Sequence, residues 1–167
     1  MKVKTDESAS HDVADGLRTV LADTYALFFK TENCHWNVEG PEFPFLHKLF
    51  EKQYQELLEA ADTVAERIRA LGMYVPGRYE DLIQGTSIRE EAEVLDSQRM
   101  IQKLLEGHSL TAETIRVVIP MAQKQGDEAT VNLLGERLLA HEKSAWMLSS
   151  CLKKGEKATE LPLKRMA

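Results

Sequence analysis

The chain has 167 residues, of which 43% are hydrophobic and 29% are charged, and its formal net charge is −6 at pH 7. This length and composition predict one globular domain and exclude a chain that is disordered throughout. The acidic balance, with a pI of about 5.4, argues against nucleic-acid binding over the whole surface.

Residues 1–12 are expected to form a flexible N-terminal tail. Two lysines in this segment are followed by no apolar stretch, so it does not predict a secretory signal. No later apolar run approaches the ~18 residues of a membrane span. The two cysteines, Cys34 and Cys151, are too few to indicate a disulfide framework. These features favour a cytoplasmic protein with no membrane partner.

Two long helices are predicted in the first half of the chain. Apolar residues recur at helical spacing from Val13 to about Asn37, where a Gly-Pro break follows. The next helix is predicted from about Glu42 to Leu71, with Gly72 as its C-terminal stop. A helix of this length is typical of a helical bundle.

The second half begins with a glycine- and proline-containing segment, residues 72 to about 95, which predicts a long crossover containing a short helix. Two further long helices are expected, from about Asp96 to Gln125 and from a cap at Asp127 to about Lys154. Residues 154–167 are expected to form a basic C-terminal tail.

There is no strand signal. The pattern therefore predicts an all-α, ferritin-like four-helix bundle over residues 13–153, with the long crossover between its second and third helices.

Residues of the types that bind metals stand at informative positions along the second helix. His47 and Glu51 are four residues apart and share one helix face, as do Asp62 and Glu66, while His35 lies just before the Gly-Pro break. Fifteen positions separate His47 from Asp62, which is roughly 22 Å along a helix. One chain therefore cannot bring both pairs to one metal.

The helical phase suggests how two chains solve this problem. Fifteen residues come within about 60° of four full turns, so both pairs face broadly the same side. Two copies packed antiparallel about a two-fold axis near Glu56 and Leu57 would form two identical sites. Imidazole and carboxylate ligands together suit iron(II). From spacing alone, a solvated helix face and hydrogen-bonded surface histidines remain the alternative.

Two segments resemble the Dps family of mini-ferritins: HWNVEGPEFPFLHKLFEKQYQELLEAADTVAERIRALG and LLAHEKSAWMLSSCL. The resemblance covers roughly residues 13–153. It implies a homo-oligomer, a hollow dodecamer built from two-fold dimers, with a two-iron ferroxidase centre at each dimer interface. It assigns His35 and His47 of one subunit, and Asp62 and Glu66 of its mate, as catalytic iron ligands. Glu51 is a further ligand, at a position where the family usually has Asp.

The resemblance also implies a reaction, the oxidation of Fe(II) to Fe(III) with hydrogen peroxide preferred over oxygen. Ferric mineral is then stored in the cavity, which protects the cell and its DNA from oxidative damage. Trp36 and Trp146 match tryptophans near the family's centre, with ordinary core packing as the alternative. Acids near the start of the last helix line a pore in the family. The matching residues here are Asp127, Glu128 and Asn132, where Asn132 replaces a common acid and Asp127 is alternatively a helix cap.

DNA binding is the alternative function. Many relatives bind DNA through lysine-rich tails, and the lysines of both tails here are offset by acidic residues. A DNA-compacting protein, associated with the nucleoid and oxidising iron only secondarily, is the competing hypothesis. Cys34, beside His35, is expected to be a small buried apolar residue and not a ligand.

Overall fold

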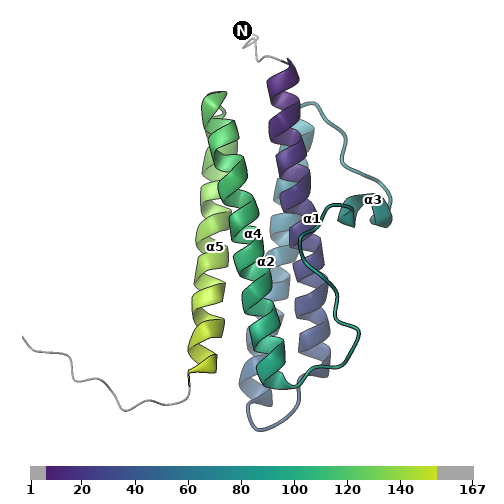
Figure 1. Ribbon diagram of the computed structural model, residues 1–167, viewed down its shortest axis with the longest axis vertical. Helices are drawn as coiled ribbons and strands as arrows, with labels where there is room; N and C mark the ends of the chain where they lie inside the picture. The colour runs from purple at the N-terminus through teal and green to yellow at the C-terminus, as the bar shows by residue number, and fades with distance from the viewer. Residues whose placement is uncertain (1–6, 154–167) are drawn as a thin grey trace, which may run out of the picture.

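The computed structural model describes residues 7–153, with side chains from His11 onward. These residues form five helices and contain no strand (Figure 1), which confirms the all-α prediction. None of the described helices is long and apolar enough to cross a membrane. The helices are α1 (Glu7–Asn37), α2 (Phe43–Ala70), α3 (Tyr79–Ile83), α4 (Ser97–Lys124) and α5 (Glu128–Leu152).

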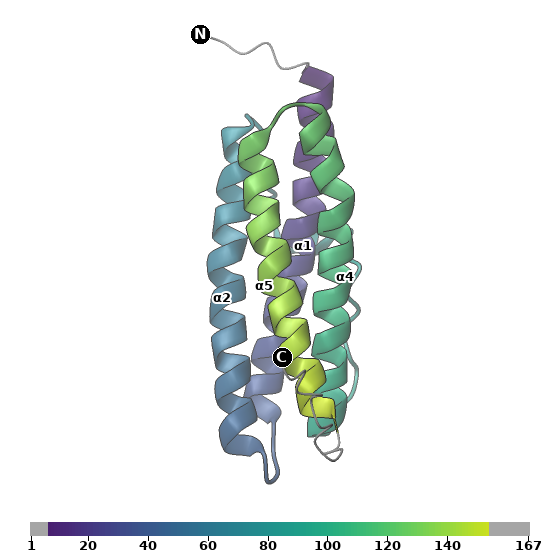
Figure 2. The ribbon, with the colours of Figure 1, turned by 90° about the vertical axis from the view of Figure 1, so that its left-hand side faces the viewer.

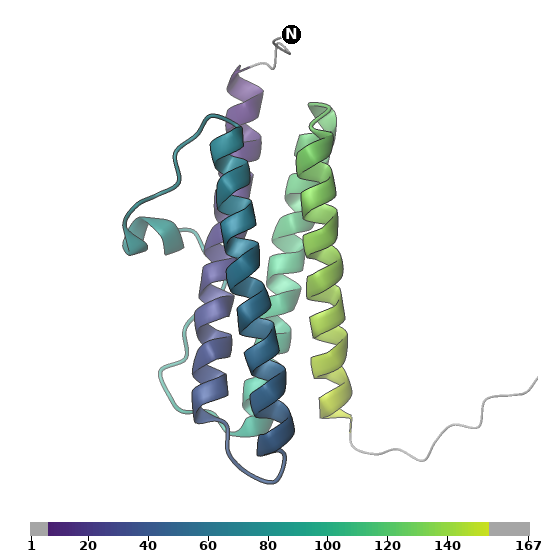
Figure 3. The same cartoon turned by 180° about the vertical axis from the view of Figure 1, so that it is seen from behind.

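The four long helices form an antiparallel bundle. Helix α1 packs along α2 and α4, and α4 packs along α5. Figure 2 shows the four helices aligned along one axis, and Figure 3 shows the crossover running outside the bundle. The crossover contains the short helix α3, as the sequence predicts, and α3 packs against α1.

The predicted helix ends agree with the structure except at the N-terminus. Helix α1 begins at Glu7 and not near Val13. The predicted start was late because Ala9 is the one apolar residue among residues 7–12, which therefore show no apolar stripe. Residues 7–12 are thus helical, while the expected tails over 1–6 and 154–167 lie outside the described residues. Gly72 adopts φ 88° and ends α2. The Gly72 amide donates to the Arg69 carbonyl and the Met73 amide to that of Ile68, an arrangement that satisfies the last carbonyls of the helix.

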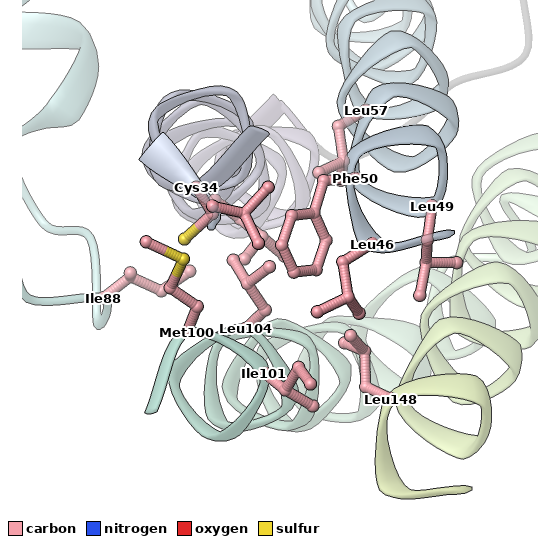
Figure 4. Packing of buried hydrophobic residues seen from close by; sticks show 12 residues of the cluster. Cys34, Leu46, Leu49, Phe50, Leu57, Ile88, Met100, Ile101, Leu104 and Leu148 are labelled. Atoms are coloured by element: carbon pink, nitrogen blue, oxygen red, sulfur yellow. The ribbon is translucent and has the colours of Figure 1, made fainter. Parts of the chain in front are cut away.

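The apolar core consists of two clusters, one toward each end of the bundle. The cluster near the α1–α2 connection contains Phe50, Leu104 and Leu148 (Figure 4), and the opposite cluster contains Ile115 and Leu134. Cys34 belongs to the first cluster and is buried. Burial raises the pKa of the Cys34 thiol to about 12, with the charge of Lys30 lowering it slightly and that of Glu91 raising it further. A thiol in this state behaves as a small apolar group.

A buried carboxylate fastens the crossover to the bundle. Asp23 of α1 is fully buried. Its oxygens accept hydrogen bonds from the Thr86 hydroxyl (2.9 Å), from the Ser87 amide (2.7 Å) and from the Ser87 hydroxyl (3.0 Å). The Thr114 hydroxyl of α4 donates a further bond of 2.7 Å. The crossover is therefore held by a charged acceptor, whose role the sequence pattern does not reveal.

Candidate metal centre

The end of α1 and the start of α2 bring two histidines together. His35 lies in the last turn of α1 and His47 near the start of α2, and a tight connection with Gly40 at φ 103° joins the helices. The Nδ1 of His35 lies 2.9 Å from the His47 carbonyl, and the Nδ1 of His47 lies 2.9 Å from the His35 carbonyl. The two rings stack with centroids 3.8 Å apart.

This reciprocal contact determines which ring nitrogen carries hydrogen. A carbonyl oxygen only accepts, so each Nδ1 must carry the proton that it donates. In the neutral ring the Nε2 atom then keeps a free lone pair. Neither Nε2 is among the sealed, unpartnered atoms of the described residues. A histidine whose other nitrogen is held by a backbone carbonyl is the usual arrangement for a metal ligand.

Two aromatic side chains of α2 hold the histidine pair in place. The Tyr54 ring meets the His35 ring edge-on with centroids 5.2 Å apart, and the Phe43 ring lies 4.9 Å from that of His47. The sequence pattern identifies both residues only as members of the apolar stripe. Their helical spacing from His47, four residues before it and seven after it, is the signal that places them on the histidine face.

The carboxylates lie further along α2. Asp62 and Glu66 are exposed and Glu51 is half-buried. Among the described residues none of the three forms a hydrogen bond or an ion pair. Within this part of a single chain, no three histidine, cysteine, aspartate or glutamate side chains come together as a metal site. The histidine pair and the two exposed carboxylates are therefore separate in one subunit.

The side chains at the expected two-fold level point in different directions. Leu57 is buried in the core. Glu56 is paired with Arg137 of α5 through two contacts, one of them 3.1 Å long. Leu58 is instead 48% exposed, and it lies four residues before Asp62 on the same helix face. An apolar side chain thus sits in the middle of the face that carries the candidate ligands.

The two tryptophans lie on the surface of the subunit. Trp36 is 58% exposed and Trp146 is 66% exposed, so neither is packed in the subunit core. Neither indole is among the rings that contact His35 or His47 in the described residues. Their expected place beside the centre remains a prediction.

The three candidate pore residues differ in their surroundings. The Asp127 carboxylate accepts from the Thr130 amide (3.1 Å) as the cap of α5 and pairs with Arg67 (2.6 Å). Burial alone would raise the pKa of Asp127, but hydrogen bonds from Arg67 and Thr130 hold it below its ordinary value. Glu128 and Asn132 are exposed. The capping role of Asp127 is therefore present in the structure, whereas its pore role stays a prediction.

Comparison with known proteins gives a consistent result. A family model described as a ferritin-like domain matches residues 14–158. The DNA protection during starvation protein of Helicobacter pylori (strain J99) is 32% identical, with 81% of this chain and 95% of that protein covered.

Solved structures agree with this match. The Dps protein of Vibrio cholerae O1, described as a member of a broad superfamily of ferritin-like diiron-carboxylate proteins, superposes with a TM-score of 0.85. Its sequence is 29% identical, with 92% of this chain and 100% of that chain covered. DpsC of Streptomyces coelicolor gives a TM-score of 0.88 at 30% identity, with 95% and 94% covered. The bundle, its crossover helix and these matches show that the chain belongs to the Dps family of ferritin-like proteins.

Proposed function

We propose that this protein oxidises ferrous iron and stores the ferric product, at sites shared between two subunits. The observation that carries the proposal is the reciprocal contact of His35 and His47, each of which uses Nδ1 on a carbonyl 2.9 Å away. This contact leaves two Nε2 lone pairs available at one end of α2. Two carboxylates that have no hydrogen-bond or ion-pair partner within the described residues, those of Asp62 and Glu66, are exposed on the same helix.

Each site would combine groups from two chains. His35 and His47 of one subunit would supply neutral nitrogen ligands, and Asp62 and Glu66 of the partner subunit would supply charge. Glu51, one turn after His47, is a further oxygen donor. Iron(II) takes a mixed set of this kind while keeping positions open for an oxidant. Iron enters as substrate and leaves the site as ferric product.

The proposed oxidant is hydrogen peroxide. Two ferrous ions give up one electron each, and one peroxide accepts both while its oxygen–oxygen bond breaks. Both peroxide oxygens end in water or in the hydrated ferric oxide, and hydrolysis of the ferric ions releases protons. Because iron and peroxide are consumed together, less of either remains to form hydroxyl radicals. Mineral would accumulate inside a hollow dodecamer assembled from the two-fold dimers.

The exposed outer face of α2 supports the dimer. Leu58 lies between the two ligand pairs and is 48% exposed. An antiparallel two-fold contact would bury this side chain against its copy and bring each histidine pair to the carboxylates of the other chain. The two free cysteines, Cys34 and Cys151, suit a reducing cytoplasm, which is the location that we propose.

A mixed-subunit experiment tests the shared site. One variant carries His35→Ala with His47→Ala, and the other carries Asp62→Ala with Glu66→Ala. Each variant alone should form cages without rapid peroxide-dependent iron oxidation. In a dimer of the two variants, one site receives all the defects and the other receives none. Random co-assembly makes half of the dimers mixed, so about a quarter of the wild-type sites should return.

The outcomes are easily separated by stopped-flow absorbance of ferric iron. No recovery in mixed cages would refute a site that is shared between subunits. Wild-type rates in both parent variants would refute iron oxidation by these residues. A conservative control, Lys52→Arg on the exposed side of α2, should leave the rate unchanged.

DNA binding is a second candidate, because a relative at 32% identity is named for DNA protection. The formal net charge of −6 opposes binding by the body of the protein, so we assign any binding to the basic tail after Cys151. A gel-shift series over salt concentration, with full-length protein and with protein ending after Cys151, tests this assignment. Equal retardation by the two proteins would contradict the tail, and no retardation at low salt would rule out DNA as a partner.

A further inference from the structure

Two buried histidines interrupt the apolar core in the middle of the bundle. His108 of α4 and His141 of α5 are each 1% exposed. His108 lies between Leu104 of one apolar cluster and Ile115 of the other, and His141 lies midway between Leu134 and Leu148. The two imidazoles therefore separate the apolar clusters at the two ends of the bundle. They are far from the candidate metal centre in the chain and take no part in it.

The two imidazoles are joined by a single hydrogen bond. Their Nδ1 atoms lie 3.0 Å apart, so one Nδ1 carries the proton and the other accepts it. Of the two Nε2 atoms, one is then a bare acceptor and the other carries hydrogen. Both are sealed from solvent and have no hydrogen-bond partner within the described residues. An added proton would bind the unprotonated Nε2, which has no hydrogen-bond acceptor among the described residues.

The groups facing this pair do not offer a counter-charge. On α5, Arg137 lies one turn before His141, and its guanidinium already holds Glu56 of α2. Gln53 of α2 lies about one turn before Glu56. Because α2 and α5 are antiparallel, Gln53 is displaced from Glu56 toward the same end of the bundle as His141 is from Arg137. Gln53 is buried, and neither of its amide atoms has a hydrogen-bond partner in the part of the chain that the structure describes. An amide is neutral and cannot balance an imidazolium.

Helices α1 and α4 add no free charge either. On α1, the buried threonines Thr24 and Thr31 donate to carbonyls of their own helix. The buried carboxylate of Asp23 is occupied by hydrogen bonds from the crossover and from Thr114. On α4, Thr111 donates to the Gly107 carbonyl. The charged side chain that acts electrostatically on both imidazoles is Arg137, and its charge is positive.

These surroundings lower the pKa of both imidazoles. Burial, followed by the charge of Arg137, lowers the pKa of His108 to about 3. Burial, His108 and Arg137 lower the pKa of His141 well below its ordinary value. In an opened chain the pKa of each imidazole returns to about 6.5. At pH values between the closed-state and opened-state pKa, the opened state binds protons that the closed state does not bind. Lowering the pH therefore favours opening.

We propose that the His108–His141 pair is a proton-sensitive device at which acidification opens the bundle core between its two apolar clusters. Above about pH 6.5 both states of the pair are neutral and the closed core is unaffected. Below about pH 6.5, each further fall of one pH unit raises the equilibrium constant for opening by up to about tenfold for each imidazole. The device belongs to the subunit fold and does not depend on the proposed iron chemistry.

Hydrogen exchange on the full-length assembled protein tests this device. Amide exchange of α4 and α5 would be measured by mass spectrometry at pH 7 and pH 5 and corrected for intrinsic exchange rates. For His108 alone, pKa values of about 3 closed and about 6.5 open predict a rise in the opening constant of about twentyfold. His141 shifts the constant in the same direction.

The matched variants use glutamine, which is polar and uncharged at both pH values. His108→Gln with His141→Gln should lose most of the twentyfold response, whereas His11→Gln, at an exposed histidine of α1, should keep it. An unchanged response in the double variant would overturn the proposal. If the double variant does not assemble, His141→Gln alone decides, because it should show a smaller response than wild type. A full wild-type response in that single variant would equally overturn the proposal.

Discussion

Two glycines within helices offer a test of how tightly the bundle is packed. A Cβ atom added at Gly16 of α1 would lie 2.8 and 2.9 Å from the two γ-methyl carbons of Val118 on α4, whereas one added at Gly135 of α5 would meet nothing within 4 Å. Val118 is buried, and valine is stiff about its only side-chain torsion. Rotation to another staggered position replaces only one of the two methyls by hydrogen, so at least one close contact remains.

The expected magnitude follows from the difference between the two sites. Alanine is favoured over glycine inside a helix by about 1 kcal/mol, which applies equally to Gly16→Ala and Gly135→Ala. Overpacking a well-filled core costs about 1–3 kcal/mol. Gly135→Ala should therefore stabilise the protein by about 1 kcal/mol, and Gly16→Ala should be less stable than Gly135→Ala by about 1–3 kcal/mol.

Guanidinium unfolding of both variants and wild type at one protomer concentration measures the free energies of unfolding. Equal denaturation midpoints for Gly16→Ala and Gly135→Ala, with unchanged m-values, would refute the close approach of α1 to α4. A loss of stability in Gly135→Ala would show that this surface of α5 is occupied in the assembled protein, and the comparison would then be made on dissociated subunits.

Substitutions at three further positions probe other parts of the structure. Asp23→Ala should lower the free energy of unfolding by about 2–4 kcal/mol, since buried donors lose a charged acceptor, and should expose the crossover to proteolysis; a resistant crossover would contradict its anchoring. Asp127→Ala should cost about 1–2 kcal/mol through the lost cap, while Asp127→Asn, which still caps, should cost less; equal losses would point to the Arg67 ion pair. Leu58→Arg should prevent two-fold dimers in size-exclusion chromatography, because like charges would meet at the axis, and intact dimers would place the axis elsewhere.

The fold was predictable because most of its helices bury a regular apolar stripe. Periodicity placed the four long helices, and the glycines and prolines after residue 71 indicated the crossover in which the short helix lies. The glycine at residue 72 marks the end of α2. The early start of α1 at Glu7 was not predictable in this way. Among residues 7–12 only Ala9 is apolar, so the sequence shows no apolar stripe there. The buried anchor Asp23 was missed for a related reason, since its partners lie more than 60 residues away in the chain.

The candidate site was only partly predictable. The separation of His47 from Asp62 is a property of one helix, so sequence alone shows that one subunit cannot join them. The reciprocal hydrogen bonds of His35 and His47 are a tertiary feature, and they depend on the connection that turns α2 back along α1. The ring contact of Tyr54 with His35 arises from the same turn. Helical spacing brings Tyr54 to the right face but does not say which ring it meets.

The two histidine pairs show why residue type alone does not identify a metal ligand. In His35 and His47, each Nδ1 is satisfied by a carbonyl, and neither Nε2 is among the sealed, unpartnered atoms of the described residues. In His108 and His141, the Nδ1 atoms use each other and both Nε2 atoms are sealed beside a positive charge. A cation would meet there the same penalty that excludes a proton. The different hydrogen-bond partners of the two pairs are therefore the reason that we propose iron binding for one pair and a response to acid for the other.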